Sequence, residues 1–448
     1  MNNSSRIIIK DNTKDIKKDI LSSVPTLTKK ICNKTIEQLK KEGVFVFPEI
    51  LNDSEDLSGN QIVLQLFDEK YRTGNIMGFL GCNEDRLTIE SRFSKGNSDY
   101  FFHYMLEKVL EIPNVLELNV DTNKDDLLYN LLIFLFPYYL RKAMRIGLYK
   151  TYIRKKYNDS NVRGNIDIAR FIKKNIPFDG KVSYSQREFS YDNYLMELIR
   201  HTIEYIKAKS FGKQLLRKVR DETSSITEVT NAYKLYDRRN IINENKKKPI
   251  RHAYYQEYRE LQRLCIMILQ NEKHSIGFEN QQIHGILIDG AWLWEEYINT
   301  LICEKFYHPM NKKNKGKQFL FNRNKGAIFP DFISMNAEDR IIVDAKYKPI
   351  GNIKSHDYHQ LLAYMFRFDS KCGYYVYPDV FSFIQEMKLN NGVSYEGKTA
   401  PREENIEVIK YGFHIPQEAD SYGSFSKLIK KSEEKIKELF TSINEQSA

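Results

Sequence analysis

Two aspartates and a lysine in the last third of the chain have the residue types and spacing to hold a divalent cation. Asp331 follows a short apolar run, and Asp344 and Lys346 end a run of β-branched residues. The polar stretch 336–339 between them suits a hairpin turn, so we expect the two aspartates to converge at one end of a strand pair. Converging carboxylates repel one another unless a cation joins them, and oxygen ligands select hard cations such as Mg²⁺.

The chemistry expected of such a centre is hydrolysis of a phosphodiester bond. A metal ion polarises the scissile phosphate and lowers the pKa of a bound water, with Mn²⁺ as a substitute for Mg²⁺. Lys346 shares a strand face with Asp344, where it can stabilise developing negative charge. The competing interpretation is an ordinary ion pair at a strand end, because charged strand ends are common.

Two helices are expected to complete this centre. The run that begins at Trp292 predicts an amphipathic helix, from which Glu295 reaches the metal, with Glu296 as the alternative, because a one-residue change in helix phase decides between them. The helix after His356 places Gln360 and Tyr364 four residues apart on one face, where an amide and a phenol can contact phosphate or order the site.

Length and composition predict a soluble protein of several domains. The chain has 448 residues, of which 41% are hydrophobic and 29% charged, and this length exceeds what one core usually supports. We predict a β-rich unit over residues 1–98, for which a barrel is one arrangement, and a mainly helical region over 99–275. Residues 276–448 then form the domain that carries the acidic cluster.

A net charge of +10 favours a polyanionic partner such as double-stranded DNA, although solubility alone would also explain it. The helical pattern after residue 99 extends to about residue 158. Arg154, Lys155, Lys156 and Arg163 surround the polar loop 158–161 there, which makes this loop a candidate contact surface, although such residues are more often only solvated charge.

A cytoplasmic location without a membrane span is expected. The five cysteines are far apart and odd in number, with no Cys-x-x-Cys pair, which argues against disulfides and zinc. No secretion signal is read at the polar N-terminus. The most apolar stretch, from Leu127 to Leu140, contains Pro137 and is too short to cross a bilayer, so it predicts a buried helix.

The order Glu295, Pro330-Asp331, Asp344-x-Lys346 and Gln360-x-x-x-Tyr364 resembles the PD-(D/E)xK nuclease superfamily, including the glutamine–tyrosine signature of its RecB-like branch. This resemblance implies an α/β endonuclease-like domain at the C-terminus, joined to an α+β N-terminal module. It also implies an Mg²⁺-dependent deoxyribonuclease in which Asp331, Asp344, Lys346 and Glu295 are catalytic, with Gln360 and Tyr364 in support.

Segments outside that domain resemble the McrC family of restriction subunits, most of all its LlaJI-type branch. They are the segments 86–92, 104–106, 161–167 and 187–193. The resemblance implies a nuclease subunit that acts with a McrB-like AAA+ GTPase, which uses GTP and supplies DNA-site recognition and translocation. The N-terminal half would dock on that motor and stimulate it, with Arg154, Lys155, Lys156 and Arg163 as candidate docking residues.

Two other interpretations stay open at this point. The chain could be a non-catalytic adaptor that activates an NTPase or grips DNA, with a merely structural acidic cluster. Alternatively, Gly392 to Thr399 match the pattern of a phosphate-binding loop. That loop needs a strand before it and a helix after it, whereas Ala400-Pro401 follows here, so a glycine-rich hairpin is favoured.

Overall fold

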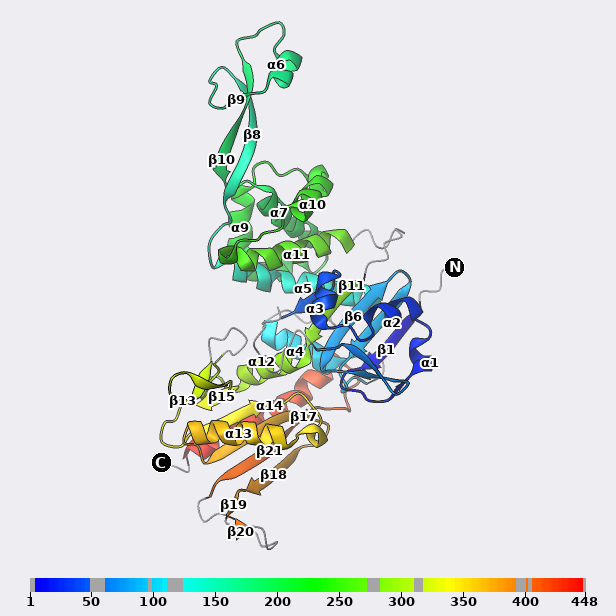
Figure 1. Ribbon diagram of the computed structural model, residues 1–448, viewed down its shortest axis with the longest axis vertical. Helices are drawn as coiled ribbons and strands as arrows, with labels where there is room; N and C mark the ends of the chain where they lie inside the picture. Colours follow the sequence, from blue (N-terminus) through cyan, green and yellow to red (C-terminus); the bar gives the residue numbers. More distant parts are fainter. Residues whose placement is uncertain are drawn as a thin grey trace. The chain divides into compact units, whose positions relative to one another are not determined.

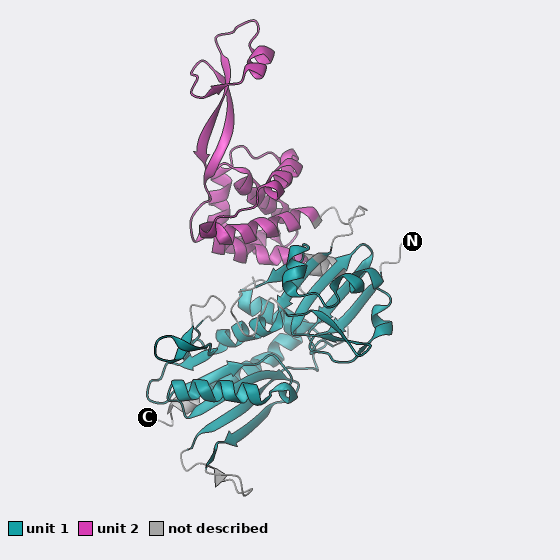
Figure 2. Ribbon diagram, in the orientation of Figure 1, with its two compact units in different colours: residues 1–120, 279–448 teal, residues 121–278 magenta. Residues whose placement is uncertain are grey.

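The computed structural model of the chain describes residues 5–48, 61–95, 99–110, 124–271, 283–309, 317–391, 400–401 and 405–445. The chain folds as two compact units (Figure 2). Unit 1 combines Met1–Val120 with Glu279–Ala448, and unit 2 is Asp121–Phe278. The architecture is mixed α and β, as expected. The domain boundaries predicted at residues 98 and 275 stay predictions.

The first half of unit 1 is built on a five-stranded sheet, here called the N-terminal sheet. Its order is β1 (Arg6–Lys10), β7 (Asp85–Glu90), β6 (Ile76–Cys82), β11 (His284–Asp289) and β3 (Phe45–Phe47). Strand β11 comes from the second segment of the unit, yet it pairs antiparallel with β6 and parallel with β3. The two segments of unit 1 are therefore joined by backbone hydrogen bonds within one sheet.

Short helices and a small sheet cover the apolar core of the N-terminal sheet. The helices are α1 (Lys18–Leu21), α2 (Pro25–Ile31) and α3 (Ile36–Lys41), and the small sheet has the order β2 (Ile16–Lys17), β5 (Lys70–Thr73), β4 (Leu64–Phe67). Helix α3 is favoured by a capping box, in which Thr35 and Gln38 satisfy each other's backbone N–H groups. Val24, Leu27 and Leu39 are fully buried in this core.

A six-stranded sheet, here called the C-terminal sheet, dominates the rest of unit 1. Its order is β12 (Phe306–Tyr307), β15 (Phe332–Ser334), β16 (Ile341–Ala345), β17 (Cys372–Asp379), β21 (Glu407–His414) and β18 (Phe383–Lys388). Strands β16, β17 and β21 are parallel, and β15 joins β16 as an antiparallel hairpin. Helix α13 (Ser355–Arg367) makes the crossover between β16 and β17, which parallel neighbours require.

Helices cover both faces of the C-terminal sheet (Figure 1). Alternate residues of β17 face opposite sides. The Tyr375 hydroxyl donates a hydrogen bond to the Asp357 carbonyl of α13, whereas the Tyr374 ring lies 5.1 Å from the Phe440 ring of α14 (Tyr422–Glu445). On the α14 side the Trp294 indole of α12 (Gly290–Ile302) donates to the Val376 carbonyl at 3.1 Å.

Unit 1 also contains, in its described residues, the helix α4 and two hairpins, besides a short 3-10 helix at Ile350–Asn352. Helix α4 spans Tyr100–Leu110, and the hairpins are the pair β13 (Gln318–Phe321) and β14 (Lys325–Ile328) and the pair β19 (Asn390–Asn391) and β20 (Ala400–Pro401). The predicted helix after His356 is confirmed as α13, and the helical pattern predicted after residue 99 begins with α4.

Unit 2 consists of a helical bundle and a projecting arm. The bundle comprises α5 (Lys124–Met144), α7 (Tyr194–Lys207), α8 (Gly212–Leu216), α9 (Arg220–Val229), α10 (Arg238–Lys247) and α11 (Gln256–Asn271). The arm comprises β8 (Thr151–Asp159), β9 (Asn165–Ile166), α6 (Ile168–Lys174) and β10 (Val182–Ser190). The arm extends away from the bundle, with β9 and α6 at its far end (Figure 1).

The predicted helical pattern up to residue 158 is wrong at its end. Residues 151–159 form β8, which pairs with β10 along its whole length, from Thr151 opposite Ser190 to Asp159 opposite Val182. Exposed and half-buried residues alternate along β8, as they do in a two-stranded ribbon. A partner thirty residues away in the sequence therefore decided the conformation of this segment.

The apolar stretch around Pro137 lies in α5, as predicted, and its residues from Leu131 to Phe136 are buried. Within the described ranges, none of the helices combines the length and the apolar character that crossing a membrane requires.

Candidate functional site

The hairpin β15–β16 brings Asp331 and Asp344 to the same end of the C-terminal sheet. Phe332 pairs with Val343 and Ile333 with Ile342, and this register continued by one residue sets Asp331 opposite Asp344. Asp331 accepts a hydrogen bond from the Ala345 backbone N–H at 2.9 Å through its Oδ2 atom. Both carboxylates are buried, with exposed fractions of 7% and 2%. The structure thus places the two acids as their spacing predicted.

Lys346 lies beside these acids and connects them to helix α13. Its Nζ atom is 3.0 Å from Asp344 Oδ2 and donates a hydrogen bond to Gln360 Oε1 at 3.3 Å. Gln360 donates in turn to the Tyr364 hydroxyl at 2.8 Å. The residues that the sequence spacing singled out on β16 and α13 therefore form one continuous polar chain.

The charges of the cluster act on Tyr364, which is almost fully buried. Burial raises the pKa of the Tyr364 phenol, and the carboxylates of Asp344 and Asp331 raise it further. The phenol therefore keeps its proton and stays a hydrogen-bond donor at neutral pH. Because the carboxylates of Asp331 and Asp344 both raise the pKa of the Tyr364 hydroxyl, the three side chains belong to one cluster.

Glu295 and Glu296 lie on helix α12, which begins where Asp289 accepts hydrogen bonds from Ala291 and Trp292 at 2.7 and 3.1 Å. Glu295 is buried and Glu296 is half-buried. The carboxylates lie 3.6 Å and 3.7 Å from the Nε2 atom of His308. The orientation of the helix therefore does not select one glutamate over the other, since both side chains reach the same imidazole.

His308 also belongs to this site, although no sequence pattern singled it out. Its Nδ1 atom lies 2.8 Å from the Asp331 carbonyl oxygen, and its ring stacks on Phe332 at 4.9 Å. Burial lowers the pKa of His308, but the hydrogen bond that its imidazole donates to Glu296 and the charge of Glu295 outweigh burial, so the pKa is raised. His308 connects Glu295 and Glu296 of α12 to Asp331, which directly precedes β15, and no spacing motif marks this histidine.

The donor set of this site fits Mg²⁺ only as a partial shell. Over the described ranges, no three histidine, cysteine, aspartate or glutamate side chains form a group that could hold a metal. Glu295 is thus not grouped with Asp331 and Asp344 as a third ligand. Magnesium in nucleic-acid enzymes is usually bound through one or two carboxylates, with water and substrate phosphate completing the shell. Two buried carboxylates that converge beside one lysine match this pattern.

The predicted docking residues lie in unit 2. Arg154, Lys155 and Lys156 are on strand β8 of the arm, and Arg163 follows β8 in the loop to β9. Arg154 and Lys156 are exposed, whereas Lys155 contacts Glu188 at 3.5 Å. Register places Arg187 opposite Arg154, so three cations share one face of the arm.

The phosphate-loop pattern at residues 392–399 lies outside the described residues. On either side of it, Asn390 pairs with Pro401 and Asn391 with Ala400 as antiparallel strands. A phosphate-binding loop opens a helix at its end, whereas a strand follows here. The flanking structure gives this pattern no support as a nucleotide site.

This chain is similar to a known protein family. A family model described as the McrBC 5-methylcytosine restriction system component matches residues 71–378. Among curated proteins the comparison found no match.

Two solved structures are similar to this chain. A refined half-complex from a tetradecameric assembly of Thermococcus gammatolerans McrB AAA+ hexamers with bound McrC matches with TM-score 0.47 and 15% identity, covering 96% of this chain and 100% of that chain. A Thermococcus gammatolerans McrBC complex matches with TM-score 0.33 and 17% identity, covering 66% and 87%. Because both TM-scores are low, only the family match supports an assignment.

Proposed function

Since the chain belongs to the McrBC 5-methylcytosine restriction system component family, we propose that it is the DNA-cleaving subunit of a GTP-dependent restriction system. The observation that carries this proposal is the convergence of Asp331, Asp344 and Lys346 at one end of the C-terminal sheet. Their order in the sequence resembles the PD-(D/E)xK pattern, and their burial beside one another supports the proposal.

The proposed reaction adds water across one P–O bond of DNA. The water oxygen joins phosphorus, and the leaving sugar oxygen takes a proton. Mg²⁺, or Mn²⁺ in its place, would be held by Asp331 and Asp344 and would polarise the phosphate and lower the pKa of a bound water. Lys346 stabilises negative charge on the phosphate oxygens, because its ammonium group lies 3.0 Å from Asp344 Oδ2, at the place where the phosphate would bind.

The residues around this pair hold it in place. Gln360 and Tyr364 fix the direction of the Lys346 side chain through their chain of hydrogen bonds. Glu295 and Glu296 act through His308, which contacts the backbone of Asp331. We therefore assign Glu295 a supporting role in this proposal. It would contact the metal directly only in a DNA-bound conformation.

The partner in this proposal is a McrB-like AAA+ GTPase, which uses GTP itself. One of the similar solved structures is described as an assembly of McrB AAA+ hexamers with bound McrC. The arm of unit 2 is suited to docking, because its far end exposes large apolar side chains that a monomer would normally bury. These are Ile166, Ile168, Ile172, Ile176 and Phe178.

The test is DNA cleavage with Mg²⁺, measured with and without the GTPase partner and GTP, for the wild type and Asp344→Ala. Asp339→Ala is the matched control, because Asp339 is an exposed carboxylate in the turn of the same hairpin. We expect partner- and GTP-dependent cutting that Asp344→Ala abolishes and Asp339→Ala retains. Equal cutting by all three proteins would refute this active site.

The adaptor interpretation predicts a different result. An adaptor would stimulate the GTPase or bind DNA without cutting it, and Asp344→Ala would leave that activity intact. Buried, converging carboxylates favour the nuclease, because burying like charges is costly unless a bound cation or substrate uses them.

A further inference from the structure

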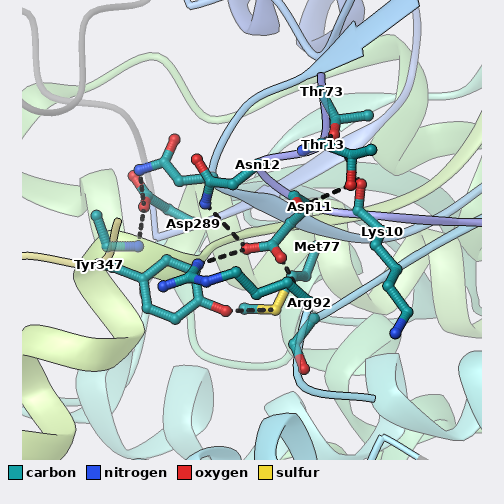
Figure 3. Close-up of polar contacts among 12 residues, drawn as sticks. Lys10, Asp11, Asn12, Thr13, Thr73, Met77, Arg92, Asp289 and Tyr347 are labelled. Carbon is teal, nitrogen blue, oxygen red and sulfur yellow. Dashed lines mark hydrogen bonds and ion pairs between the residues drawn. The ribbon is translucent and has the colours of Figure 1, made fainter. Parts of the chain in front are cut away.

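A buried ion pair in the N-terminal sheet lies against the residue that follows Lys346 (Figure 3). Asp11 follows β1 and is fully buried, and Arg92 follows β7. The Arg92 backbone N–H donates to Asp11 Oδ1 at 2.6 Å, and Arg92 Nη1 lies 3.6 Å from Asp11 Oδ2. A buried pair of this kind is weak evidence for stability, so its role must be sought in what it holds.

What the pair holds is the ring of Tyr347. The Arg92 guanidinium carbon lies 4.5 Å from the centre of this ring. Burial raises the pKa of the Tyr347 hydroxyl, and the charge of Asp11 raises it further. The same hydroxyl lies 3.6 Å from the sulfur of Met77 on β6. Arg92 and Met77 therefore contact one tyrosine, which is only 3% exposed, and Asp11 holds Arg92 in place.

The ring also packs on the first residue of helix α12. A Cβ atom added to Gly290 would lie 2.7 Å from Tyr347 Cε1, so the helix backbone and the ring are in close contact. Helix α12 carries Glu295 and Glu296. The same tyrosine thus contacts the start of the helix that reaches His308.

Strand pairing alone does not fix Lys346. Strand β16 ends at Ala345, and one further hydrogen bond, from the Lys346 N–H to the Val376 carbonyl at 2.9 Å, continues the ladder. Successive residues in extended backbone point to opposite sides, so anchoring Tyr347 on one side sets the direction of Lys346 on the other. Lys348 provides a second anchor through Asp357 of α13, at 2.7 Å.

We propose that Tyr347, held by the Arg92–Asp11 pair, is a positioning residue that keeps Lys346 against Asp344. The N-terminal sheet is then part of the nuclease centre and not only a docking module. The inference rests on the proposed nuclease function and adds to it a set of residues far from the motif in sequence.

The test compares single-turnover DNA cleavage by the complete complex, with its GTPase partner, GTP and Mg²⁺, for three variants of the full chain. Tyr347→Leu removes the ring, Tyr347→Phe keeps the ring and its stacking on Arg92, and Tyr104→Leu removes an equally buried tyrosine elsewhere in unit 1. We expect at least a 10-fold lower rate for Tyr347→Leu, because small misplacements of a catalytic group cost about 10- to 100-fold. Tyr347→Phe should restore most of the rate, and Tyr104→Leu should match the wild type per folded molecule.

Arg92→Lys provides a second route if Tyr347→Leu does not fold. Lysine keeps the charge that neutralises Asp11 but cannot stack a planar group on the ring, so a several-fold loss of rate is expected. A crystal structure of whichever variant folds should show Lys346 Nζ more than 4 Å from Asp344 Oδ2, compared with 3.0 Å. Wild-type rates in Tyr347→Leu or, failing that, in Arg92→Lys would overturn the inference, as would an unchanged separation.

Lys346→Ala separates this inference from the proposed function. If Lys346→Ala and Asp344→Ala both cut DNA as the wild type does, the nuclease proposal fails. If both are inactive while Tyr347→Leu cuts normally, or Tyr104→Leu loses as much as Tyr347→Leu, only the positioning role fails.

Discussion

Asp331 and Asp344 are buried carboxylates that face each other across a hairpin, with one lysine beside them. Burial and mutual repulsion both disfavour two ionised acids at such a place. Lys346 offsets one of the two charges, since it lies within 3.0 Å of Asp344. The centre is therefore destabilised in the absence of a cation, as binding sites often are, and a bound cation should stabilise the fold.

The first prediction concerns this stabilisation. Saturating Mg²⁺ should raise the melting temperature of the wild-type chain, because a ligand that binds only the native state adds about 2.7 kcal/mol at one hundred times its Kd. In Asp331→Asn the magnesium-dependent shift should disappear, although the metal-free protein should melt no earlier, because one repulsive charge is gone. Differential scanning calorimetry with and without Mg²⁺ measures both effects.

Asp339→Asn is the control for that experiment, since Asp339 is exposed in the same hairpin. It should keep the shift. A full magnesium shift in Asp331→Asn would show that Asp331 is not a metal ligand.

In unit 2, the buried residue Glu197 should make the stability of the fold depend on pH. Burial and the charges of Asp192 and Asp237 raise the pKa of Glu197 to about 7. The folded chain therefore holds this proton more tightly than the unfolded chain, for which the ordinary value is 4.5. The stabilising effect of the proton is complete below pH 4.5 and is lost as the pH rises through about 7.

Glu197→Gln should remove this dependence. Relative to the wild type, the variant should gain about 1 kcal/mol at pH 5 and about 3 kcal/mol at pH 8, read from denaturant unfolding of unit 2. Glu228→Gln, at an exposed position on α9, should show no such trend. A stability difference between Glu197→Gln and the wild type that does not change with pH would contradict the assignment.

At the scale of elements, the arm of unit 2 presents cations and aromatic rings on one face. Arg154 and Lys156 on β8 and Arg187 on β10 are exposed, and the Arg187 guanidinium carbon lies 4.9 Å from the Tyr152 ring centre. Tyr152 in turn lies 4.9 Å from Phe189. A rigid two-stranded ribbon with such a face suits contact with an acidic partner surface.

Charge reversal of this face should weaken the action on the GTPase partner. For the triple variant Arg154→Glu, Lys156→Glu and Arg187→Glu we expect at least a 10-fold loss of stimulated GTP hydrolysis, because like charges then meet at the interface. The wild-type stimulation should itself fall as salt is raised. Steady-state GTPase assays over a range of salt concentrations measure both.

The matched control reverses three exposed cations at the bundle of the same unit, Lys213, Arg217 and Arg220. This triple variant carries the same change in net charge and should stimulate normally. Equal loss in both triple variants would indicate a general charge effect and not docking by the arm.

At the scale of the whole molecule, strand β11 (residues 284–289) lies between β6 and β3 and so joins the two segments of unit 1 in one sheet. The approach of β11 to β6 is close. A Cβ atom on Gly285 would lie 2.1 Å from the Phe79 carbonyl oxygen, and its φ of +147° is one that other residues rarely adopt. Gly78 on β6 faces β11 in the same way.

Gly285→Ala should therefore destabilise unit 1 by about 2–4 kcal/mol, through both strain and the clash. Denaturant unfolding that follows unit 1 measures this loss. Gly43→Ala is the control within the unit, because Gly43 also has a positive φ, of +111°, but its added Cβ would lie a milder 3.3 Å from the nearest atom. A loss in Gly285→Ala no larger than that in Gly43→Ala would mean that β6 and β11 separate easily.

The sequence by itself determined the local parts of this protein. The hairpin around residues 336–339, the helix with Gln360 and Tyr364 on one face, and the buried helix around Pro137 are all confirmed, because turn residues and periodicity act over a few positions. The resemblance to the McrC family is confirmed by the family match over residues 71–378. The LlaJI-type branch and the roles of the site residues stay predictions.

Only the tertiary structure decided which distant segments meet. It brought Asp11 and Arg92 to Tyr347, and it paired residues 151–159 with β10 as a strand. It also placed β11 in the N-terminal sheet. Each of these choices depends on packing and hydrogen bonds between residues tens to hundreds of positions apart, for which no local pattern exists. His308 was missed for the same reason, since its partners are Glu295 in helix α12, which precedes it, and Asp331 just before strand β15, which follows it.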